Sequence, residues 1–286
     1  TAAMYQNTYA GFNAIADLTG HKRDVESIAL SPDGGLLASG SRDGHLIVWN
    51  LAKRAPVFDL DAKSDWINDV AYSPDGKRIA AACMDGSVLL VDAKAGRKIR
   101  SYKRGKWEED DGHRDAVLSI AVSPDGSILA SGGRDNVIIL WDADSKRMIR
   151  RLEGHEKAVT DLCFSPDGKI LASASWDETV RLWNVDDGDP IRTLRGHKGY
   201  VMAVDFHPDG RILMSGGSDK RVIQWDTQTG ESAKESLAKG RVRAVRFSPN
   251  GLVCATGDSA ERLTIWYETL NRPVVTMTGL QDEART

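Results

Sequence analysis

The stretch that decides the fold is residues 155–183, which read HEKAVTDLCFSPDGKILASASWDETVRLW. Val159–Phe164 alternates apolar and polar residues, as a half-buried strand does, and Ile170–Ser175 and Thr179–Trp183 form two further strand-like runs. Between the first two lies Ser165-Pro166-Asp167-Gly168, the composition of a tight turn, because proline fixes φ and glycine tolerates the left-handed region. The stretch therefore predicts three consecutive antiparallel strands.

Two markers repeat this plan along the chain in one register. The tight turn begins at Ser31, Ser73, Ser123, Ser165, His207 and Ser248. The second marker stands at Trp49, Val91, Trp141, Trp183, Trp225 and Trp266, and both series advance by 42, 50, 42, 42 and 41 residues. A fourth strand, such as Ile191–Leu194, follows each second marker, and no segment predicts a helix. Four short strands repeating about every 40–45 residues predict an all-β protein built from propeller blades.

The pattern Gly-His, then Ser-Pro-Asp-Gly, then Trp-Asp or Trp-Asn resembles the WD repeat (WD40), over about residues 12–278. The regularity of the repeats resembles bacterial members of that family. The resemblance implies one β-propeller of four-stranded antiparallel blades over residues 1–286. The expected repeats are approximately 20–61, 62–111, 112–153, 154–195, 196–237 and 238–278, with 1–19 contributing a closing outer strand.

The number of blades stays open between six, which we favour, and seven if part of the ring is missing. Six sets of inner strands are present, but two segments compete for the last outer strand, Phe12–Leu18 and Val274–Thr278. A seven-bladed ring needs about 28 strands, which is more than the sequence offers.

Composition excludes several classes of protein. The net charge is −3 with acidic and basic residues well mixed, so we expect no nucleic-acid binding. No apolar run is long enough to cross a membrane, and the N-terminus has no secretory signal pattern. Cys83, Cys163 and Cys254 have no disulfide spacing, which favours a reducing, cytoplasmic location. Because the chain starts at Thr1 rather than at methionine, we expect a piece of a longer protein.

Four repeats carry histidine, serine and aspartate at fixed offsets, which invites comparison with a hydrolase triad. These sets, each with its tryptophan, are His21, Ser39, Asp43 and Trp49; His113, Ser131, Asp135 and Trp141; His155, Ser173, Asp177 and Trp183; and His197, Ser215, Asp219 and Trp225. An enzyme needs one exposed nucleophile rather than four equivalent copies. The resemblance implies instead a buried hydrogen-bonded chain from Trp to Ser to His to Asp. We therefore expect no catalytic residue, no metal site and no cofactor.

Two repeats depart from this pattern. The second has Lys63, Ala81, Asp85 and Val91 at the four places, and the sixth has Ala238, Thr256, Ala260 and Trp266. We expect these two repeats to be the softer ones.

Function is expected on the loops. The resemblance implies that partners dock on the face formed by the turn between strands two and three and by the loop from strand four to the next strand one. The repeat register places the candidate partner-binding residues there, namely Trp66, Met84, Trp107, Trp176, Tyr200, Met202, Arg42, Arg134 and Arg241. Aromatic residues, methionine and arginine are typical of interface hot spots.

Three details sharpen this expectation. Trp176 and Tyr200 fall on adjacent repeats and should form one patch. Trp107 lies in an eight-residue insertion between a basic and an acidic run, which is either a solvated loop or a docking loop. The arginines, with Arg23 and Arg243, could bind an acidic or phosphorylated peptide.

The favoured function is a non-catalytic scaffold or adaptor that binds a protein or peptide. One alternative is the C-terminal sensor propeller of a larger signalling protein whose kinase or NTPase part is absent. A third and least favoured alternative is an enzyme at the channel mouth.

Overall fold

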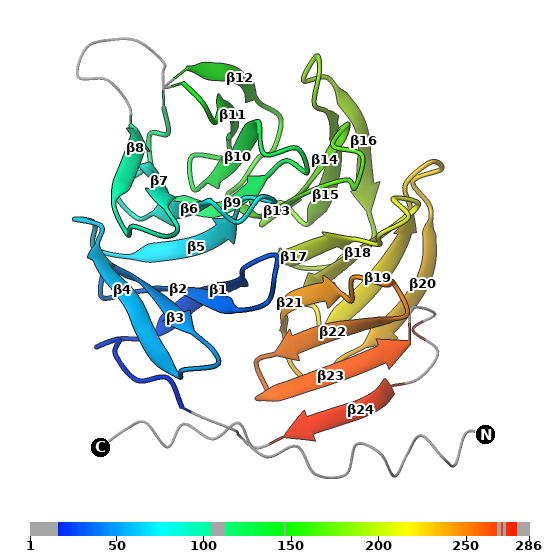
Figure 1. The fold of residues 1–286 in the computed structure, drawn as a ribbon. Helices are drawn as coiled ribbons and strands as arrows, with labels where there is room; N and C mark the ends of the chain where they lie inside the picture. The colour runs from blue at the N-terminus through cyan, green and yellow to red at the C-terminus, as the bar shows by residue number, and fades with distance from the viewer. Residues whose placement is uncertain (1–16, 104–111, 146, 268–269, 271–272, 279–286) are drawn as a thin grey trace. The chain divides into compact units, whose positions relative to one another are not determined.

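The structure is a computed structural model that describes residues 17–103, 112–145, 147–267, 270 and 273–278. This part of the chain holds twenty-four strands in six four-stranded antiparallel sheets and contains no helix (Figure 1). The fold class is therefore the predicted one, an all-β propeller type with six four-stranded blades. We number the blades one to six in chain order.

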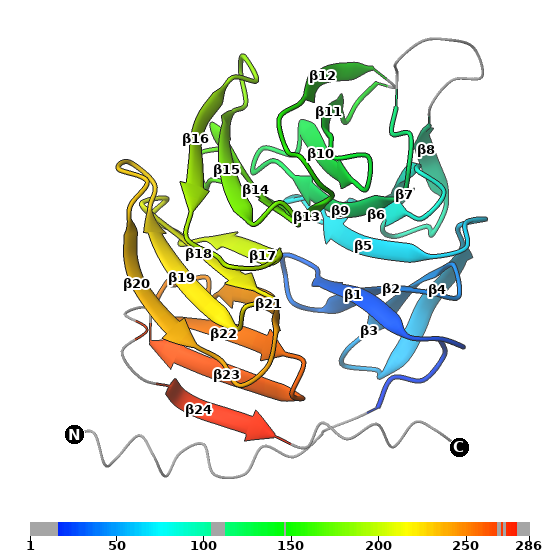
Figure 2. The ribbon, with the colours of Figure 1, turned by 180° about the vertical axis from the view of Figure 1, so that it is seen from behind.

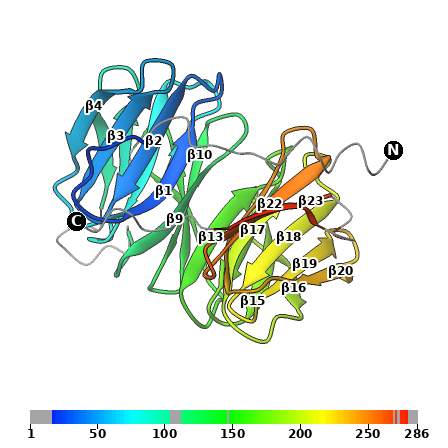
Figure 3. The same ribbon diagram turned by 90° about the horizontal axis from the view of Figure 1, so that it is seen from below.

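The chain forms two compact units, and the N-terminal unit comprises Ala16–Ser173 and Trp183–Asp189. It contains the first three blades, in each of which consecutive strands pair in the order of the sequence. Figure 3 shows the strands of blade one lying side by side. The strands are β1 (Val25–Leu30), β2 (Leu36–Ser41), β3 (His45–Asn50), β4 (Ala55–Asp61), β5 (Ile67–Tyr72), β6 (Arg78–Cys83), β7 (Val88–Asp92), β8 (Lys98–Tyr102), β9 (Val117–Val122), β10 (Ile128–Gly133), β11 (Ile138–Asp142) and β12 (Met148–Leu152).

The C-terminal unit comprises Ala174–Leu182 and Pro190–Thr286 and contains blades five and six, seen from behind in Figure 2. Its strands are β17 (Val201–Phe206), β18 (Ile212–Gly217), β19 (Arg221–Asp226), β20 (Ser232–Leu237), β21 (Val242–Phe247), β22 (Val253–Asp258), β23 (Arg262–Tyr267) and β24 (Pro273–Thr278). Blade four is divided between the units and consists of β13 (Val159–Phe164), β14 (Ile170–Ser175), β15 (Thr179–Asn184) and β16 (Pro190–Arg195). The inner strands of this blade match the predicted ones within one residue.

The repeated turn between the first two strands of a blade is closed by its own side chains. In blade one, the Ser31 hydroxyl donates to Asp33 at 2.6 Å and accepts the backbone N–H of Leu36 at 2.8 Å. Gly34 has a φ of 70°, the left-handed region that favours glycine, and its N–H donates to the Ser31 carbonyl. The same bonds recur in blades two, three and four, so the turn fixes the register of the two strands.

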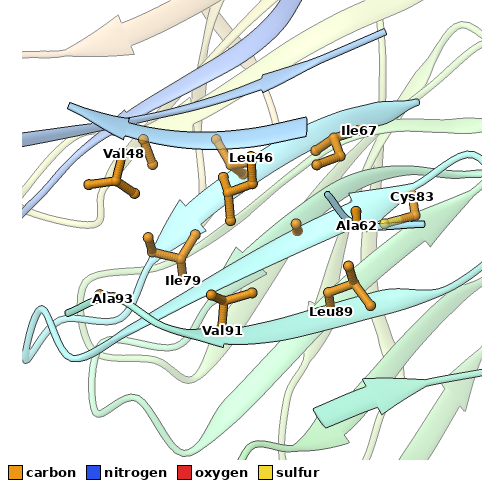
Figure 4. Close-up of a cluster of buried hydrophobic side chains, with 12 residues drawn as sticks. Leu46, Val48, Ala62, Ile67, Ile79, Cys83, Leu89, Val91 and Ala93 are labelled. Atoms are coloured by element: carbon orange, nitrogen blue, oxygen red, sulfur yellow. The ribbon is translucent and has the colours of Figure 1, made fainter. Parts of the chain in front are cut away.

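The hydrophobic core lies between neighbouring blades. Figure 4 shows Leu46 and Val48 of blade one facing Ile79, Leu89 and Val91 of blade two, all buried. The same arrangement joins blade two to three, three to four, and five to six. The second and third strands are covered on both sides, whereas the fourth strands are largely exposed.

Glycines on the second strands let the blades approach closely. A Cβ atom on Gly40 would lie 2.5 Å from Cγ2 of Ile67 in the next blade, and one on Gly216 would lie 2.3 Å from Cγ1 of Val242. Such distances are shorter than any van der Waals contact, so a larger residue would force the blades apart.

Arginines on the fourth strands join neighbouring blades at their outer ends, a feature that the sequence did not predict. Arg100 donates to the Ala143 carbonyl of blade three at 2.8 Å, and Arg150 donates to the Asp186 carbonyl at 2.8 Å. In the C-terminal unit, Arg192 donates to the Gln228 carbonyl. Each guanidinium satisfies a carbonyl in a turn that has no strand partner.

Two predictions about the chain ends have different outcomes. The fourth strand of blade six is β24, which contains the predicted run Val274–Thr278. The closing strand predicted from residues 1–19 falls mainly outside the described residues and stays a prediction.

Within the described ranges, no helix is long and apolar enough to cross a membrane.

Candidate binding surface

Within a blade, the repeated histidine, serine and tryptophan form a buried hydrogen-bonded network, as expected. In blade one, Trp49 Nε1 donates to Ser39 Oγ at 2.8 Å, and Ser39 Oγ lies 2.7 Å from His21 Nε2. His21 Nδ1 faces the Asp43 carboxylate at 3.2 Å, so Nδ1 carries the proton and Nε2 accepts from the serine.

The same hydrogen-bonded network recurs with nearly the same geometry in blades three, four and five. Trp to Ser distances are 2.7 Å in blade three and 2.8 Å in blades four and five, and Ser to His distances are 2.7–2.8 Å. In blades three and five the His to Asp distance is 3.0 Å. All four serines are buried, and each hydroxyl is held between an indole and an imidazole. The arrangement is that of a structural network, not of an accessible nucleophile.

Blades two and six lack the complete network, as predicted. In blade six, Trp266 Nε1 donates to Thr256 Oγ1 at 2.9 Å, and Ala238 stands in the place of the histidine. Blade two has Val91 in the place of the network tryptophan, yet its second and third strands are almost wholly buried apolar residues. Dense apolar packing therefore replaces the hydrogen bonds in blade two but not in blade six.

The network aspartates predict a loss of stability in acid. Burial alone would raise the pKa of Asp135, but the hydrogen bond and charge of His113 and the N–H groups of Arg114 and Val137 outweigh it and lower that pKa. The pKa of Asp219 is lowered in the same way through His197.

Because the folded-state pKa lies below the unfolded one, these carboxylates stabilise the fold fully above about pH 4, and the contribution is lost as pH falls further. We expect Asp135→Asn and Asp219→Asn to flatten the acid limb of a plot of the unfolding midpoint against pH between about 2 and 5. An unchanged slope would show that these aspartates titrate normally in the folded chain.

Two positions on neighbouring blades meet at the predicted partner-binding loops. One is the residue just before the turn aspartate, and the other lies three residues after the histidine place of the next blade. In the N-terminal unit these are Arg42 and Trp66, and the guanidinium carbon lies 4.9 Å from the centroid of the indole ring. This is the geometry of a cation–π contact.

The charge of Arg42 is already neutralised. Arg42 Nη1 lies 3.0 Å from the Asp24 carboxylate, and Arg42 Nε contacts Glu26. The arginine therefore supports Trp66 rather than offering a free positive charge to a partner. Asp24 directly precedes β1 and Glu26 lies on β1, so both carboxylates reach Arg42 from the start of one strand.

In the C-terminal unit the same two positions hold Trp176 and Tyr200, which form the patch expected from the sequence. Their rings stack with centroids 5.6 Å apart and an angle of 28° between the planes. Tyr200 keeps 46% of its surface exposed, whereas Trp176 is half-buried beneath it. Trp176 Nε1 is buried and makes no hydrogen bond to any described residue. We call these two residues the aromatic pair.

The remaining candidates have varied surroundings. Met84 and Met202 are half-buried, and the Met84 N–H donates to the Trp66 carbonyl at 3.0 Å. Arg134 and Arg241 are exposed and form no ion pair with any described residue, and Arg243 on β21 is likewise exposed and unpaired. Trp107 lies outside the described residues. Across the described chain, no group of three potential ligand side chains could hold a metal ion.

Comparison with known proteins supports the repeat assignment. A family model described as WD domain, G-beta repeat matches residues 12–50, 54–92, 106–142, 146–184 and 188–226. Blade six lies beyond these ranges, in keeping with its loss of the histidine and the aspartate.

Curated relatives match short parts of the chain. The small ribosomal subunit protein RACK1 of Candida albicans is 41% identical over 56 residues, which is 20% of this chain and 18% of that protein. The Medicago sativa protein of the same name is 47% identical over 47 residues, or 16% and 14% of the two chains. The one from Schizosaccharomyces pombe is 44% identical over 46 residues, or 16% and 15%. The matches span less than a fifth of each relative.

Proposed function

Because the chain belongs to the WD40 family of WD domain, G-beta repeat proteins, we propose that it is a non-catalytic scaffold that binds a protein or peptide at the aromatic pair. The observation that carries this proposal is the stack of Trp176 on an exposed Tyr200. The repeat needs no aromatic residue at either position, since other blades hold serine, arginine or alanine there. Large rigid aromatic side chains contribute most of the binding energy at many protein interfaces.

The surroundings of the aromatic pair favour an acidic partner. In the next pair of blades, the same two repeat positions hold Ser218 on blade five and Arg241 on blade six. Arg243 lies two residues further along the sequence. Both arginines are exposed and without an ion pair among the described side chains. A partner segment with an apolar or aromatic residue followed by carboxylates or a phosphate fits this chemistry.

We also propose that the chain works in a reducing compartment. In the described part of the chain its three cysteines form no disulfide, and burial raises the pKa of Cys83 to about 11 and of Cys254 to about 12. Thiols with such pKa values remain protonated at neutral pH and are unreactive.

A pull-down that compares surface variants tests the scaffold proposal. The chain and a Trp66→Ala, Trp176→Ala, Tyr200→Ala variant are used as bait, and the captured proteins are identified. We expect one protein that the parent chain captures to be lost from the variant. Removing one hot-spot residue typically costs 2 kcal/mol or more, which is roughly thirtyfold in affinity.

Tyr267→Ala provides the matched control, because Tyr267 is also an exposed aromatic residue. It is the last residue of β23, away from the loops that hold the aromatic pair. All baits are compared for folding by circular dichroism. If the triple variant and Tyr267→Ala capture the same protein as the parent chain, the aromatic pair is not the binding surface.

A further inference from the structure

Blade six contains a cavity of about 240 Å³ that includes the place of the missing histidine. Its walls include Leu237, Ala238, Lys239, Asp258, Arg262 and Trp266. Trp266 is the network tryptophan of this blade, and Ala238 stands where blade five has His197. All of these residues belong to the C-terminal unit.

Two substitutions in the repeat open this cavity. In blade five, Gly196 packs so closely that an added Cβ would lie 2.9 Å from Cη2 of Trp225. Blade six has Leu237 in the place of that glycine, and this leucine is 68% exposed instead of closely packed on Trp266. Ala238 then leaves the volume of an imidazole ring unfilled. Trp266 is accordingly less buried than Trp225, at 6% against 1% exposure.

The arginine in the cavity wall has lost the partners that its counterpart has in blade five. Arg221 Nε lies 3.0 Å from the Glu235 carboxylate, and Arg221 Nη1 donates to the Gly196 carbonyl at 2.9 Å. Arg262 occupies the same repeat position, but Thr276 replaces the glutamate and Leu237 replaces the glycine. Arg262 makes no ion pair with any described residue.

The other polar groups make the cavity rich in donors. Lys239 adds a second positive charge at the wall, and it too has no described ion pair. The one acidic residue of the wall, Asp258, already accepts the N–H of Gly240 at 3.1 Å and that of Ala260 at 2.8 Å. The net charge of the wall is therefore positive, above an apolar floor of Trp266 and Ala238.

We propose that this cavity binds a carboxylate with a compact apolar or aromatic body, the carboxylate pairing with Arg262 as Glu235 does with Arg221. The apolar body would lie on Trp266, in the place that the imidazole of His197 takes in blade five. An apolar protein cavity of about 150 Å³ is enough to bind benzene, so the volume suits a ligand of benzoate size. Both a free acid and an acidic peptide side chain supply such a carboxylate.

Fluorine NMR with 4-fluorobenzoate as the probe tests the proposal on the whole chain. We expect a saturable shift of the probe resonance that Arg262→Gln weakens at least tenfold, because a hydrogen bond to a charged group is lost. The control Arg221→Gln leaves binding unchanged, since that position is already paired with Glu235. Thr276→Glu returns the missing acid to blade six and should abolish binding while the fold is kept.

A second probe identifies the source of the carboxylate. The peptide Ala-Phe-Glu-Ala, acetylated and amidated, has only its side-chain carboxylate, and competition with 4-fluorobenzoate would favour an acidic partner segment. Binding of the fluorobenzoate alone would favour a free acid. Binding that is unchanged in both Arg262→Gln and Thr276→Glu, or no saturable binding to the folded parent chain, would overturn the proposal.

Discussion

Replacing Trp225 with alanine is expected to lower the free energy of unfolding by about 3–5 kcal/mol, the usual cost of removing a large buried aromatic side chain. Trp225 is almost wholly buried, and its indole N–H donates to Ser215 at 2.8 Å. The substitution leaves a cavity and removes the first donor of the hydrogen-bonded network that continues through His197 to Asp219. Chemical denaturation followed by circular dichroism measures the change.

Trp266→Ala in blade six is the matched control for this prediction. Trp266 already borders a cavity, and no histidine continues its hydrogen bond beyond Thr256. Its removal should therefore cost less than the removal of Trp225. Equal losses in the two variants would show that the complete network adds nothing to the stability of a blade.

The second large effect concerns the contact between blades five and six. Gly216→Val places a side chain where Cγ1 of Val242 lies only 2.3 Å from the new Cβ, so the two blades must separate. Overpacking of this kind typically costs about 1–3 kcal/mol. The midpoint of denaturation should fall, and protection of β21 and β22 from hydrogen exchange should decrease.

Blade six offers the control for this prediction at the equivalent glycine. An added Cβ on Gly257 would meet only the Ala244 side chain, at an ordinary 3.8 Å. Gly257→Val should be neutral or slightly stabilising, because glycine in a strand loses more backbone entropy on folding. If Gly216→Val lowered stability no more than Gly257→Val does, blades five and six would not be in close contact at Gly216.

The repeat made most of the fold predictable. Turns and tryptophans in one register fixed the strands, so Val159–Phe164 and Ile170–Ser175 appear in the structure with the predicted bounds. The hydrogen-bonded network was implied by the resemblance to the WD repeat, and it agrees with the need of a buried indole N–H for an acceptor. The contact between Trp176 and Tyr200 was predictable because both belong to positions that meet on neighbouring blades.

Features that depend on three-dimensional packing were not predictable. The neutralisation of Arg42 by Asp24 and Glu26 depends on side-chain directions at the exposed start of β1. The cavity in blade six was missed because the sequence shows only that a histidine is absent, not whether neighbouring side chains fill its place. The exposure of Leu237 shows that they do not.

Hydrogen–deuterium exchange on the complex with the captured partner tests whether the partner binds at the aromatic pair. We expect the partner to slow exchange in peptides covering residues 174–182 and 198–204, and Tyr200→Ala to remove this protection. Protection confined to the outer strands β16, β20 and β24, with none around Trp176 and Tyr200, would contradict it.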